Sequence, residues 1–359
     1  MQITRLRVDG LRCLSKVELA VGPGLNLFLG SNGAGKTSLI EAAYCLGSGK
    51  SFRFGGPDAL IARDQSTLHV YAELELQGRA IRVGFERGAA SWRALCNGER
   101  VAELARLASL VPVVCFSPES HELVGGPSEI RRRFFDWIVF HVEPGFGDAY
   151  RRYMRALKQR NALLKRDPAE TELTVWTETL VHAGEELAGF RASVFPRFEK
   201  CMAQTLGELL GEMGSAQIAF KRGWRDGVSL RERLQSIGVR EREVGYTLSG
   251  PHRADWAVAF DGLSVREEGS RCQQKLVALA SVLVAATLYR EYRGEAPLVA
   301  LDDLFSELDL EHQRRALAAC AKLNAQTWVT GTTPSPALDA WLGPVSTFHV
   351  ERGRVVGPA

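Results

Sequence analysis

Short apolar runs and amphipathic stretches alternate near both ends of the chain. Residues 25–29 (LNLFL) form the kind of apolar run found in buried strands, and Leu39, Ala43 and Leu46 then recur at helical spacing. The N-terminal residues alternate between apolar and polar positions, as a half-buried strand does. A second apolar run, residues 297–301 (PLVAL), predicts another buried strand. Both ends of the chain therefore predict α/β structure.

The middle of the chain, from about residue 127 to residue 214, has a helical pattern instead. Apolar residues recur there at helical spacing, as at Tyr150, Met154, Leu157 and Leu164. Pro144 with Gly145, and Asp167 with Pro168, would divide the region into separate helices. No apolar heptad is sustained over several repeats, so we expect a short helical lobe and not a long coiled coil.

Composition restricts the class of protein. The chain has 359 residues, 45% of them hydrophobic, which suits a globular protein of one large domain or two. A net charge of +3 is only mildly basic, so any nucleic-acid surface must come from local clusters. The seven Cys are scattered and include no CxxC, which argues against a disulfide framework or a zinc site. Without a leader or an apolar run near the ~20 residues that span a bilayer, we expect a cytoplasmic protein with no membrane partner.

Residues 30–37 (GSNGAGKT) lie between the first predicted strand and helix and match the phosphate-binding pattern GxxxxGK[ST]. In such a loop backbone N–H groups surround phosphate oxygens, Lys36 would reach the β- and γ-phosphates, and the Thr37 hydroxyl would bind Mg²⁺. A plain glycine-rich turn is the alternative, but the flanking strand and helix favour ATP binding. The residues expected to contact ATP are Gly30, Ser31, Asn32, Gly33, Ala34, Gly35, Lys36, Thr37 and Ser38.

Two carboxylates, Asp302 and Asp303, follow the second apolar run. A phosphate-binding loop needs a carboxylate on a neighbouring strand to hold the metal, so we expect Asp302 to bind Mg²⁺ together with Thr37. Asp303 is expected to polarise the attacking water, which makes Asp302, Asp303 and Lys36 the predicted catalytic residues. A pair of solvated acids at a strand end is the alternative.

A third motif, SRCQQK at residues 270–275, precedes an apolar helical stretch. The order of phosphate-binding loop, Ser-x-x-Gln helix start and Asp-Asp pair resembles that of ATP-binding-cassette (ABC) ATPases. In that superfamily the Ser and the following amides contact the γ-phosphate held by the opposing subunit. The resemblance implies that Ser270 and Gln273 bind ATP across a homodimer, and that residues 306–309 (SELD) lie at its seam.

Five segments resemble, in order, the RecF family of bacterial recombinational-repair ATPases. They are LGSNGAGKTSLIEAAYCLGSGKSFR, VVCFSPESHELVGGPSEIRRRFFD, YTLSGPHRADW, SRCQQKL and LDDLFSELD. The resemblance covers nearly the whole chain and implies an α/β fold, an ABC-type P-loop ATPase head with an inserted, mainly helical lobe. We place the N-terminal part of the head at residues 1–120, the lobe or short arm at 121–235, and the C-terminal part of the head at 236–359.

Some positions depart from the related patterns. Cys272 stands where the RecF family usually has Gly, and its β-carbon would crowd the approach to the γ-phosphate. Asp303 replaces the Glu of transporter cassettes, as is usual in the family, and Thr330 or Thr332 stands where many cassettes have His. These features predict slow hydrolysis, a weak DNA-dependent ATPase that acts as a switch.

Basic residues gather in the predicted lobe. Arg151, Arg155 and Lys158 share one helix face, so we expect them to contact DNA phosphates; a solvated helix surface is the alternative. They belong to a set of seven with no acid among them: Arg151, Arg152, Arg155, Lys158, Arg160, Lys165 and Arg166. Residues 131–133 (RRR) alternate with aromatic core positions and are expected to buttress the lobe junction.

Three isolated positions also carry predictions. His252 is expected to be structural, because it lies in a turn with no recognisable Ser or Cys partner. Arg12 and Arg53 are candidates for contacting the nucleotide, with ordinary surface charge as the alternative.

The family resemblance implies an ATP-gated clamp for DNA replication and repair. It would dimerise on ATP, bind single-stranded or gapped duplex DNA, and assist recombinase loading and SOS induction with RecR and RecO as partners. The alternatives are an ABC-type ATP-binding scaffold, a transporter-like nucleotide-binding subunit and a small-metabolite kinase. The helical insertion argues against a transporter subunit, and the Ser270 motif has no role in a monomeric kinase. The scaffold stays open because of Cys272 and Asp303.

Overall fold

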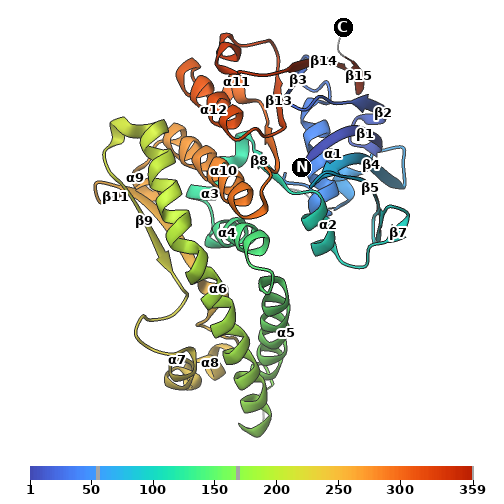
Figure 1. The fold of residues 1–359 in the computed structure, drawn as a ribbon. Helices are drawn as coiled ribbons and strands as arrows, with labels where there is room; N and C mark the ends of the chain where they lie inside the picture. The colour runs from blue at the N-terminus through green and yellow to red at the C-terminus, as the bar shows by residue number, and fades with distance from the viewer. Residues whose placement is uncertain (54–56, 167–169, 358–359) are drawn as a thin grey trace. The chain divides into compact units, whose positions relative to one another are not determined.

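The computed structural model describes residues 1–53, 57–166 and 170–357, and the chain divides into two compact units (Figure 1). The first unit comprises Met1–Ser120 and Ala278–Ala359, and the second comprises His121–Val277. The predicted lobe starts at the same place but ends at residue 235. The second unit continues to Val277 because strands after residue 215 pair with one another and pack against its helices.

A mixed six-stranded sheet forms the centre of the first unit. Its order is β15-β14-β3-β13-β12-β8, and all neighbouring pairs are parallel except β14 with β15. The strands are β3 (Leu25–Leu29), β8 (Val113–Phe116), β12 (Leu298–Leu301), β13 (Thr327–Gly331), β14 (Val345–Glu351) and β15 (Arg354–Val356). Every residue of β3 and β12 is buried, as expected for strands covered on both faces, so both predicted buried strands are confirmed.

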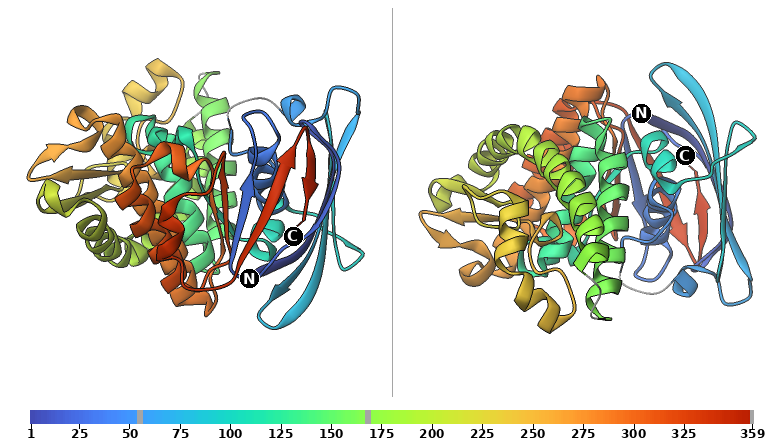
Figure 2. Two further views of the ribbon diagram at one scale, coloured as in Figure 1. Left: turned by 90° about the horizontal axis from the view of Figure 1, so that it is seen from above. Right: turned by 90° about the horizontal axis from the view of Figure 1, so that it is seen from below.

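The second sheet of this unit is antiparallel, with the order β2-β1-β4-β5-β6-β7. Its strands are β1 (Gln2–Leu11), β2 (Leu14–Ala20), β4 (Thr67–Leu76), β5 (Arg79–Gly88), β6 (Trp92–Cys96) and β7 (Glu99–Arg100). Buried and exposed positions alternate along β4 because only one face of the sheet covers the core. Figure 2 shows this curved sheet beside β14 and β15.

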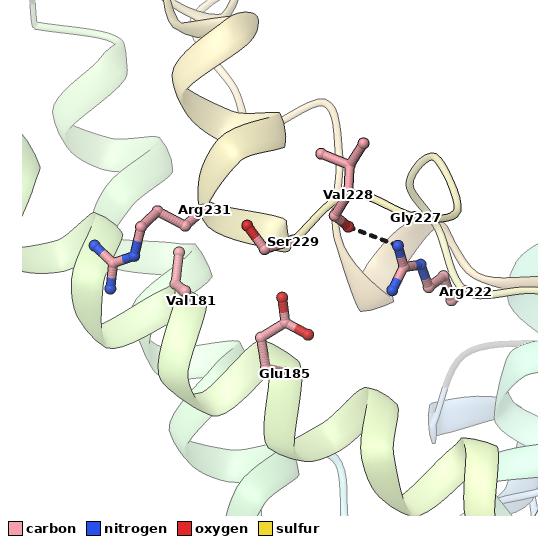
Figure 3. Close-up of a pocket in the computed structure, with 7 residues that line it drawn as sticks. All are labelled: Val181, Glu185, Arg222, Gly227, Val228, Ser229 and Arg231. Atoms are coloured by element: carbon pink, nitrogen blue, oxygen red, sulfur yellow. Dashed lines mark hydrogen bonds between the residues drawn. The ribbon is translucent and has the colours of Figure 1, made fainter.

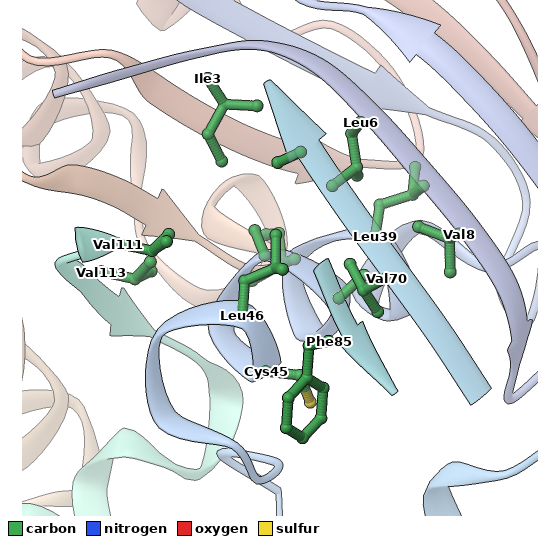
Figure 4. Close-up of a cluster of buried hydrophobic side chains, with 14 of the residues drawn as sticks. Ile3, Leu6, Val8, Leu39, Cys45, Leu46, Val70, Phe85, Val111 and Val113 are labelled. Carbon is green, nitrogen blue, oxygen red and sulfur yellow. The ribbon is translucent and has the colours of Figure 1, made fainter. Parts of the chain in front are cut away.

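Helix α1 (Lys36–Ser48) lies in a hydrophobic core to which both sheets also contribute side chains. Its apolar side chains, Leu39 and Leu46 among them, pack with Leu6 of β1 and Val70 of β4, and with Val113 at the start of β8 (Figure 4). This packing fixes the first turn of α1, and therefore the phosphate-binding loop that precedes it.

Three helices dominate the second unit: α4 (Ser128–Val142), α5 (Phe146–Leu164) and α6 (Glu170–Leu210). The predicted break at Pro144 and Gly145 is confirmed, since α4 ends before it and α5 begins after it. The break predicted at Asp167 and Pro168 falls outside the described residues. Helix α6 has 41 residues, which corresponds to a length of roughly 60 Å, and it continues through Pro196.

A three-stranded antiparallel sheet, with the order β11-β10-β9, packs against these helices. Its strands are β9 (Ala216–Lys221), β10 (Asp255–Phe260) and β11 (Leu263–Ser264). Trp256 of β10 is buried and meets Phe198 of α6 edge to face, with 5.2 Å between ring centroids. The short helices of the unit are α3 (Glu122–Gly125), α7 (Leu230–Ser236), α8 (Gly238–Val244) and α9 (Val265–Glu268).

Helix α10 (Arg271–Arg293) begins in the second unit and continues into the first, which also contains α2 (Leu104–Leu110), α11 (Leu304–Glu307) and α12 (Leu310–Lys322). Among the described helices, α10 is the one long and apolar enough to cross a bilayer. Because 72% of its apolar stretch is buried inside the fold, it has the character of a core helix.

Candidate nucleotide-binding site

The phosphate-binding loop joins the end of β3 to the start of α1. Gly35 has φ 112°, a left-handed conformation in which a side chain would be strained. A β-carbon at Gly30 would lie 2.1 Å from the carbonyl oxygen of Val350 in β14, so only glycine fits there. The N-cap of α1 makes no side-chain hydrogen bond, so the first-turn amides are not capped from within. The loop therefore has the backbone that a phosphate cradle requires.

The Lys36 side chain folds back over this loop. Its Nζ donates hydrogen bonds to the carbonyl oxygens of Gly30, at 2.8 Å, and of Ser31, at 3.0 Å. The residue is 7% exposed, so its charge is held in the loop instead of moving in solvent. A cation in this position is arranged to meet nucleotide phosphates.

Asp302, directly after β12, accepts hydrogen bonds from the hydroxyl groups of two residues on other elements. Thr37 Oγ1 of α1 donates to Asp302 Oδ1 at 2.9 Å, and Thr330 Oγ1 of β13 donates to the same oxygen at 2.7 Å. Asp302 is 3% exposed, and burial raises its pKa above the usual range although both hydroxyl groups act to lower it. Residues 265 positions apart in sequence, Thr37 and Asp302, thus meet as the motif predicts.

Asp303 has a strained backbone that Thr330 also fixes. Its φ is 56°, a left-handed conformation for a residue that is not glycine, and its N–H donates to Thr330 Oγ1 at 2.7 Å. One buried hydroxyl therefore joins the Asp302 carboxylate to the backbone of Asp303. The sequence showed Thr330 only as a position where other cassettes have His. Its link to the Asp pair was missed because it depends on β13 lying beside β12.

The donor set suits a magnesium ion bound together with phosphates. In the described parts of the chain, no three or more His, Cys, Asp or Glu side chains converge to form a protein-only metal cage. Thr37 and Asp302 offer a hydroxyl and a carboxylate oxygen within hydrogen-bond distance of each other. Mg²⁺ typically takes one or two such protein ligands and completes its shell with water and phosphate oxygens.

The Ser270 motif caps α10. Gln273 N–H donates to Ser270 Oγ at 3.3 Å, and Ser270 N–H donates to Gln273 Oε1 at 2.8 Å, a reciprocal capping box. Ser270, Arg271 and Cys272 are exposed. These residues belong to the second unit, whereas the loop and the Asp pair belong to the first.

Arg12, a candidate for contacting the nucleotide, is engaged within the protein. Its guanidinium group donates to both carboxylate oxygens of the fully buried Glu41 at 3.0 and 2.9 Å. The Ser51 hydroxyl donates to Glu41 as well. Arg53 is exposed, and its backbone N–H donates to Ser51 Oγ at 2.9 Å. Arg12 therefore ties the first hairpin to α1.

The basic face of α5 is less positive than its sequence indicates. Arg160 is 2% exposed and pairs with Glu241 at 2.6 Å, while Arg152 pairs with Glu186 and Arg151 with Asp148. The prediction that seven positive charges stay unrelieved is therefore wrong. Acids distant in sequence pair with two of them, and Asp148, one turn earlier in the same helix, pairs with a third.

Two of the three predicted DNA contacts on this face keep free charges. Arg155 and Lys158 are exposed and form no ion pair with any described residue. Arg151 is also exposed, but it shares its charge with Asp148.

In the other basic group, Arg131 and Arg132 buttress the second unit as expected, whereas Arg133 is exposed and pairs with Glu129 of its own helix. Arg131 is buried, pairs with both carboxylate oxygens of Asp255 at 2.7 and 3.0 Å, and donates to the carbonyl oxygen of Val124. His252 is also structural, since its ring contacts Tyr153 Oη at 2.6 Å and the Thr247 carbonyl at 3.1 Å. Burial lowers the pKa of His252 to about 4, so the ring is neutral at pH 7.

A hollow of about 530 Å³ lies beside α6 in the second unit (Figure 3). Arg222 donates to the carbonyl oxygen of Val228 at 2.6 Å across it, and Glu185 accepts the backbone N–H of Leu230 at 2.6 Å. Arg231 at its rim pairs with Glu178. These contacts fasten the loop after β9 to α6, and none of the predicted site residues line the hollow.

Comparison with known proteins identifies the family. Residues 2–340 match the family described as RecF/RecN/SMC N terminal domain. The chain is 42% identical, over 99% of both chains, to the DNA replication and repair protein RecF of Stenotrophomonas maltophilia (strain R551-3). It is 40% identical to the RecF protein of Xanthomonas axonopodis pv. citri (strain 306), over 100% of this chain and 99% of the other.

Solved structures agree with this result. The chain resembles the recombination mediator protein RecF-ATPrS of the RecFOR pathway, with a TM-score of 0.86 and 25% identity over 99% and 98% of the two chains. Its similarity to an Smc head domain of Pyrococcus furiosus, with a TM-score of 0.60 and 15% identity over 99% and 96%, concerns the fold alone. The predicted ABC-type head with an inserted helical region is confirmed, and the chain belongs to the RecF family of DNA replication and repair proteins.

Proposed function

We propose that this chain is an ATP-operated switch that closes as a homodimer on DNA during recombinational repair. The observation that carries the proposal is the meeting of Thr37 and Asp302 at 2.9 Å, beside a phosphate-binding loop whose Lys36 is already held in place. A relative of similar fold is described as RecF with ATP, which supports ATP as the nucleotide.

Each residue has a defined task in the proposal. Amides of residues 33–38 hold the β- and γ-phosphates, Lys36 neutralises their charge, and Thr37 and Asp302 are the protein ligands of Mg²⁺. The Mg²⁺–ATP complex supplies the phosphoanhydride bond and the charge that holds the dimer closed. Asp303 orients the attacking water, and its shorter reach compared with Glu makes hydrolysis slow.

The dimer follows from the capped start of α10. Exposed amides at a helix N-terminus attract a phosphate, and in the proposed dimer Ser270 and Gln273 approach the γ-phosphate bound by the partner. The Ser270 hydroxyl accepts the backbone N–H of Gln273 at 3.3 Å. This long hydrogen bond is weak enough for a phosphate oxygen to replace the hydroxyl as acceptor. ATP then links the subunits, and hydrolysis releases them.

DNA binding is assigned to the exposed face of α5, through Arg155 and Lys158 with a smaller share from Arg151. Contacts to phosphates from such a face carry little sequence information, which suits binding at single-stranded gaps of any sequence. By family membership we propose a cytoplasmic protein that works with RecR and RecO in recombinase loading and SOS induction.

Molar mass measured by light scattering, with and without ATP and Mg²⁺, tests the proposal. The wild type should change from monomer mass to twice that mass only when ATP and Mg²⁺ are present. Ser270→Arg should bind ATP but stay monomeric, whereas Lys36→Ala should lose both ATP binding and dimerisation. A wild type that binds ATP and stays monomeric would contradict the switch.

That last outcome would favour a second candidate, an ATP-binding scaffold. The observation in its favour is Cys272, which is exposed two residues after Ser270 at the start of α10. Cys272→Gly distinguishes the candidates, because it should restore dimerisation if the β-carbon is what prevents closure.

A further inference from the structure

The segment between α8 and β10, residues 245–254, is held from one side by the end of α5. Arg160, 2% exposed, donates to Glu241 Oε2 at 2.6 Å and to Thr247 Oγ1 at 2.8 Å. Asn161 Oδ1 accepts the Thr247 N–H at 2.8 Å and its hydroxyl at 2.7 Å. Figure 1 shows α8 beside the α5–α6 pair.

Helices α4 and α6 hold the other side of the segment. Arg191 is 3% exposed and donates to the Pro251 carbonyl at 2.7 Å, and Arg132 donates to the Ala254 carbonyl at 2.7 Å. Tyr153 and His252 add the contact of 2.6 Å between Oη and Nδ1. Buried ions are costly to desolvate, and a fully bonded network of this kind fixes one conformation of the backbone it holds.

Two residues of this fixed segment face solvent as a pair. Tyr246 is 42% exposed, and the guanidinium carbon of the exposed Arg253 lies 5.8 Å from the centroid of its ring. A β-carbon at Gly245 would be 3.6 Å from Cγ of Lys165, so the exposed Lys165 side chain runs alongside. Glu243 is the exposed acid nearby in sequence. The network therefore presents an aromatic ring beside the Arg253 cation, with the Lys165 side chain next to the preceding residue.

We propose that Tyr246 and Arg253 form a stacking site for an unpaired base of single-stranded DNA, with Lys165 on a flanking phosphate. Partly exposed aromatic rings bind bases of any sequence by stacking, and an adjacent Arg adds cation–π and phosphate contacts. A duplex buries its base faces, so Tyr246 gives a preference for single strands. The inference rests on the proposed DNA binding. It adds a contact that distinguishes single strands from duplex, which the phosphate contacts of α5 do not.

Fluorescence anisotropy with the full chain tests this site. The probes are a labelled single strand of about 25 nucleotides and a duplex of the same length, with ATP and Mg²⁺ present. Tyr246→Ala should weaken single-strand binding roughly tenfold and change duplex binding less than about twofold. Tyr246→Phe keeps the ring and should bind as the wild type does.

Tyr292→Ala is the matched control, because Tyr292 is 50% exposed but belongs to the first unit. It should leave both affinities unchanged, and circular dichroism should show each variant folded. Single-strand binding by Tyr246→Ala equal to the wild type would overturn the stacking site and leave the proposed function standing. Equal losses on single strand and duplex would also overturn it. A wild type that binds neither probe would overturn the proposed DNA binding itself.

Discussion

Thr330 and Asp302 share a buried hydrogen bond of 2.7 Å, and the same hydroxyl accepts the N–H of Asp303. The bond joins two neighbouring strands at the carboxyl end of the sheet, where the phosphate-binding loop begins. Thr330 therefore fixes the Asp302 carboxylate and the backbone of Asp303 without being a metal ligand in the proposal. ABC-type sites often have His near this position, so the hydroxyl represents a different way of ordering the same edge of the sheet.

Replacing Thr330 with Val should separate ATP binding from hydrolysis. The methyl group keeps the packing but leaves Asp302 without one donor and the Asp303 N–H without its acceptor. The Asp302 carboxylate and the backbone that presents Asp303 therefore lose a fixing contact. ATP turnover should fall at least roughly tenfold, with ATP affinity changed much less. Steady-state kinetics and equilibrium nucleotide binding measure the two effects.

Thr330→Ser should recover most of the turnover because it restores the hydroxyl. Thr332→Val is the control, since Thr332 is exposed and two residues further along the chain. If Thr330→Val hydrolysed ATP at the wild-type rate, the positioning role would be excluded.

Reversing the charge of the exposed basic residues on α5 should weaken DNA binding. Changing Arg151, Arg155 and Lys158 to Glu removes up to three phosphate contacts, so the slope of log affinity against log salt should decrease by about 2 to 3. Arg151→Glu alone should have the smallest effect, because Asp148 already neutralises this side chain. Affinities measured across a salt series give these slopes.

A control with the same change of net charge replaces three exposed residues of the antiparallel sheet, Arg79, Arg93 and Arg100, with Glu. This variant should retain its salt slope and its ATP affinity. Equal losses in both triple variants would mean that net charge, and not the α5 face, governs DNA binding.

The Arg160–Glu241 pair should be a major stabilising contact of the second unit. Arg160→Met leaves the fully buried Glu241 carboxylate without its partner, which should cost about 3 to 5 kcal/mol in the free energy of unfolding. Arg152→Met is the comparison, because both side chains of its pair are partly exposed and the loss should stay below about 1 kcal/mol. Denaturant unfolding measures both, and equal losses would contradict the structural role of Arg160.

Stability should fall as pH decreases, partly through His252. Its pKa is about 4 in the folded chain, against roughly 6.5 when unfolded. The unfolded chain therefore binds the proton first, and stability is lost as pH falls from about 6.5 to 4. From pH 7 to pH 5 the loss from this group should be about 2 kcal/mol. In denaturant titrations, the free energy of unfolding of His252→Gln should fall by that much less between pH 7 and pH 5 than the wild-type value does. An equal fall in both proteins would contradict the prediction.

The sequence by itself determined the chemistry of the phosphate-binding loop. The spacing of Gly30, Gly35, Lys36 and Thr37 is local, and a strand before and a helix after suffice to position these residues. The buried strands at 25–29 and 297–301 were equally predictable, since burial on both faces requires an unbroken apolar run. The order of the motifs was enough to recognise the ABC-type head.

Only the tertiary structure decided which charges remain available. Arg160 and Arg155 look alike in sequence, yet one is buried on Glu241 and the other is exposed, because α8 packs against one face of α5 and not the other. The role of Thr330 depends in the same way on two strands that adjoin in the sheet but are separated by α12 in the chain. Contacts between distant residues arise from packing, which local patterns do not encode.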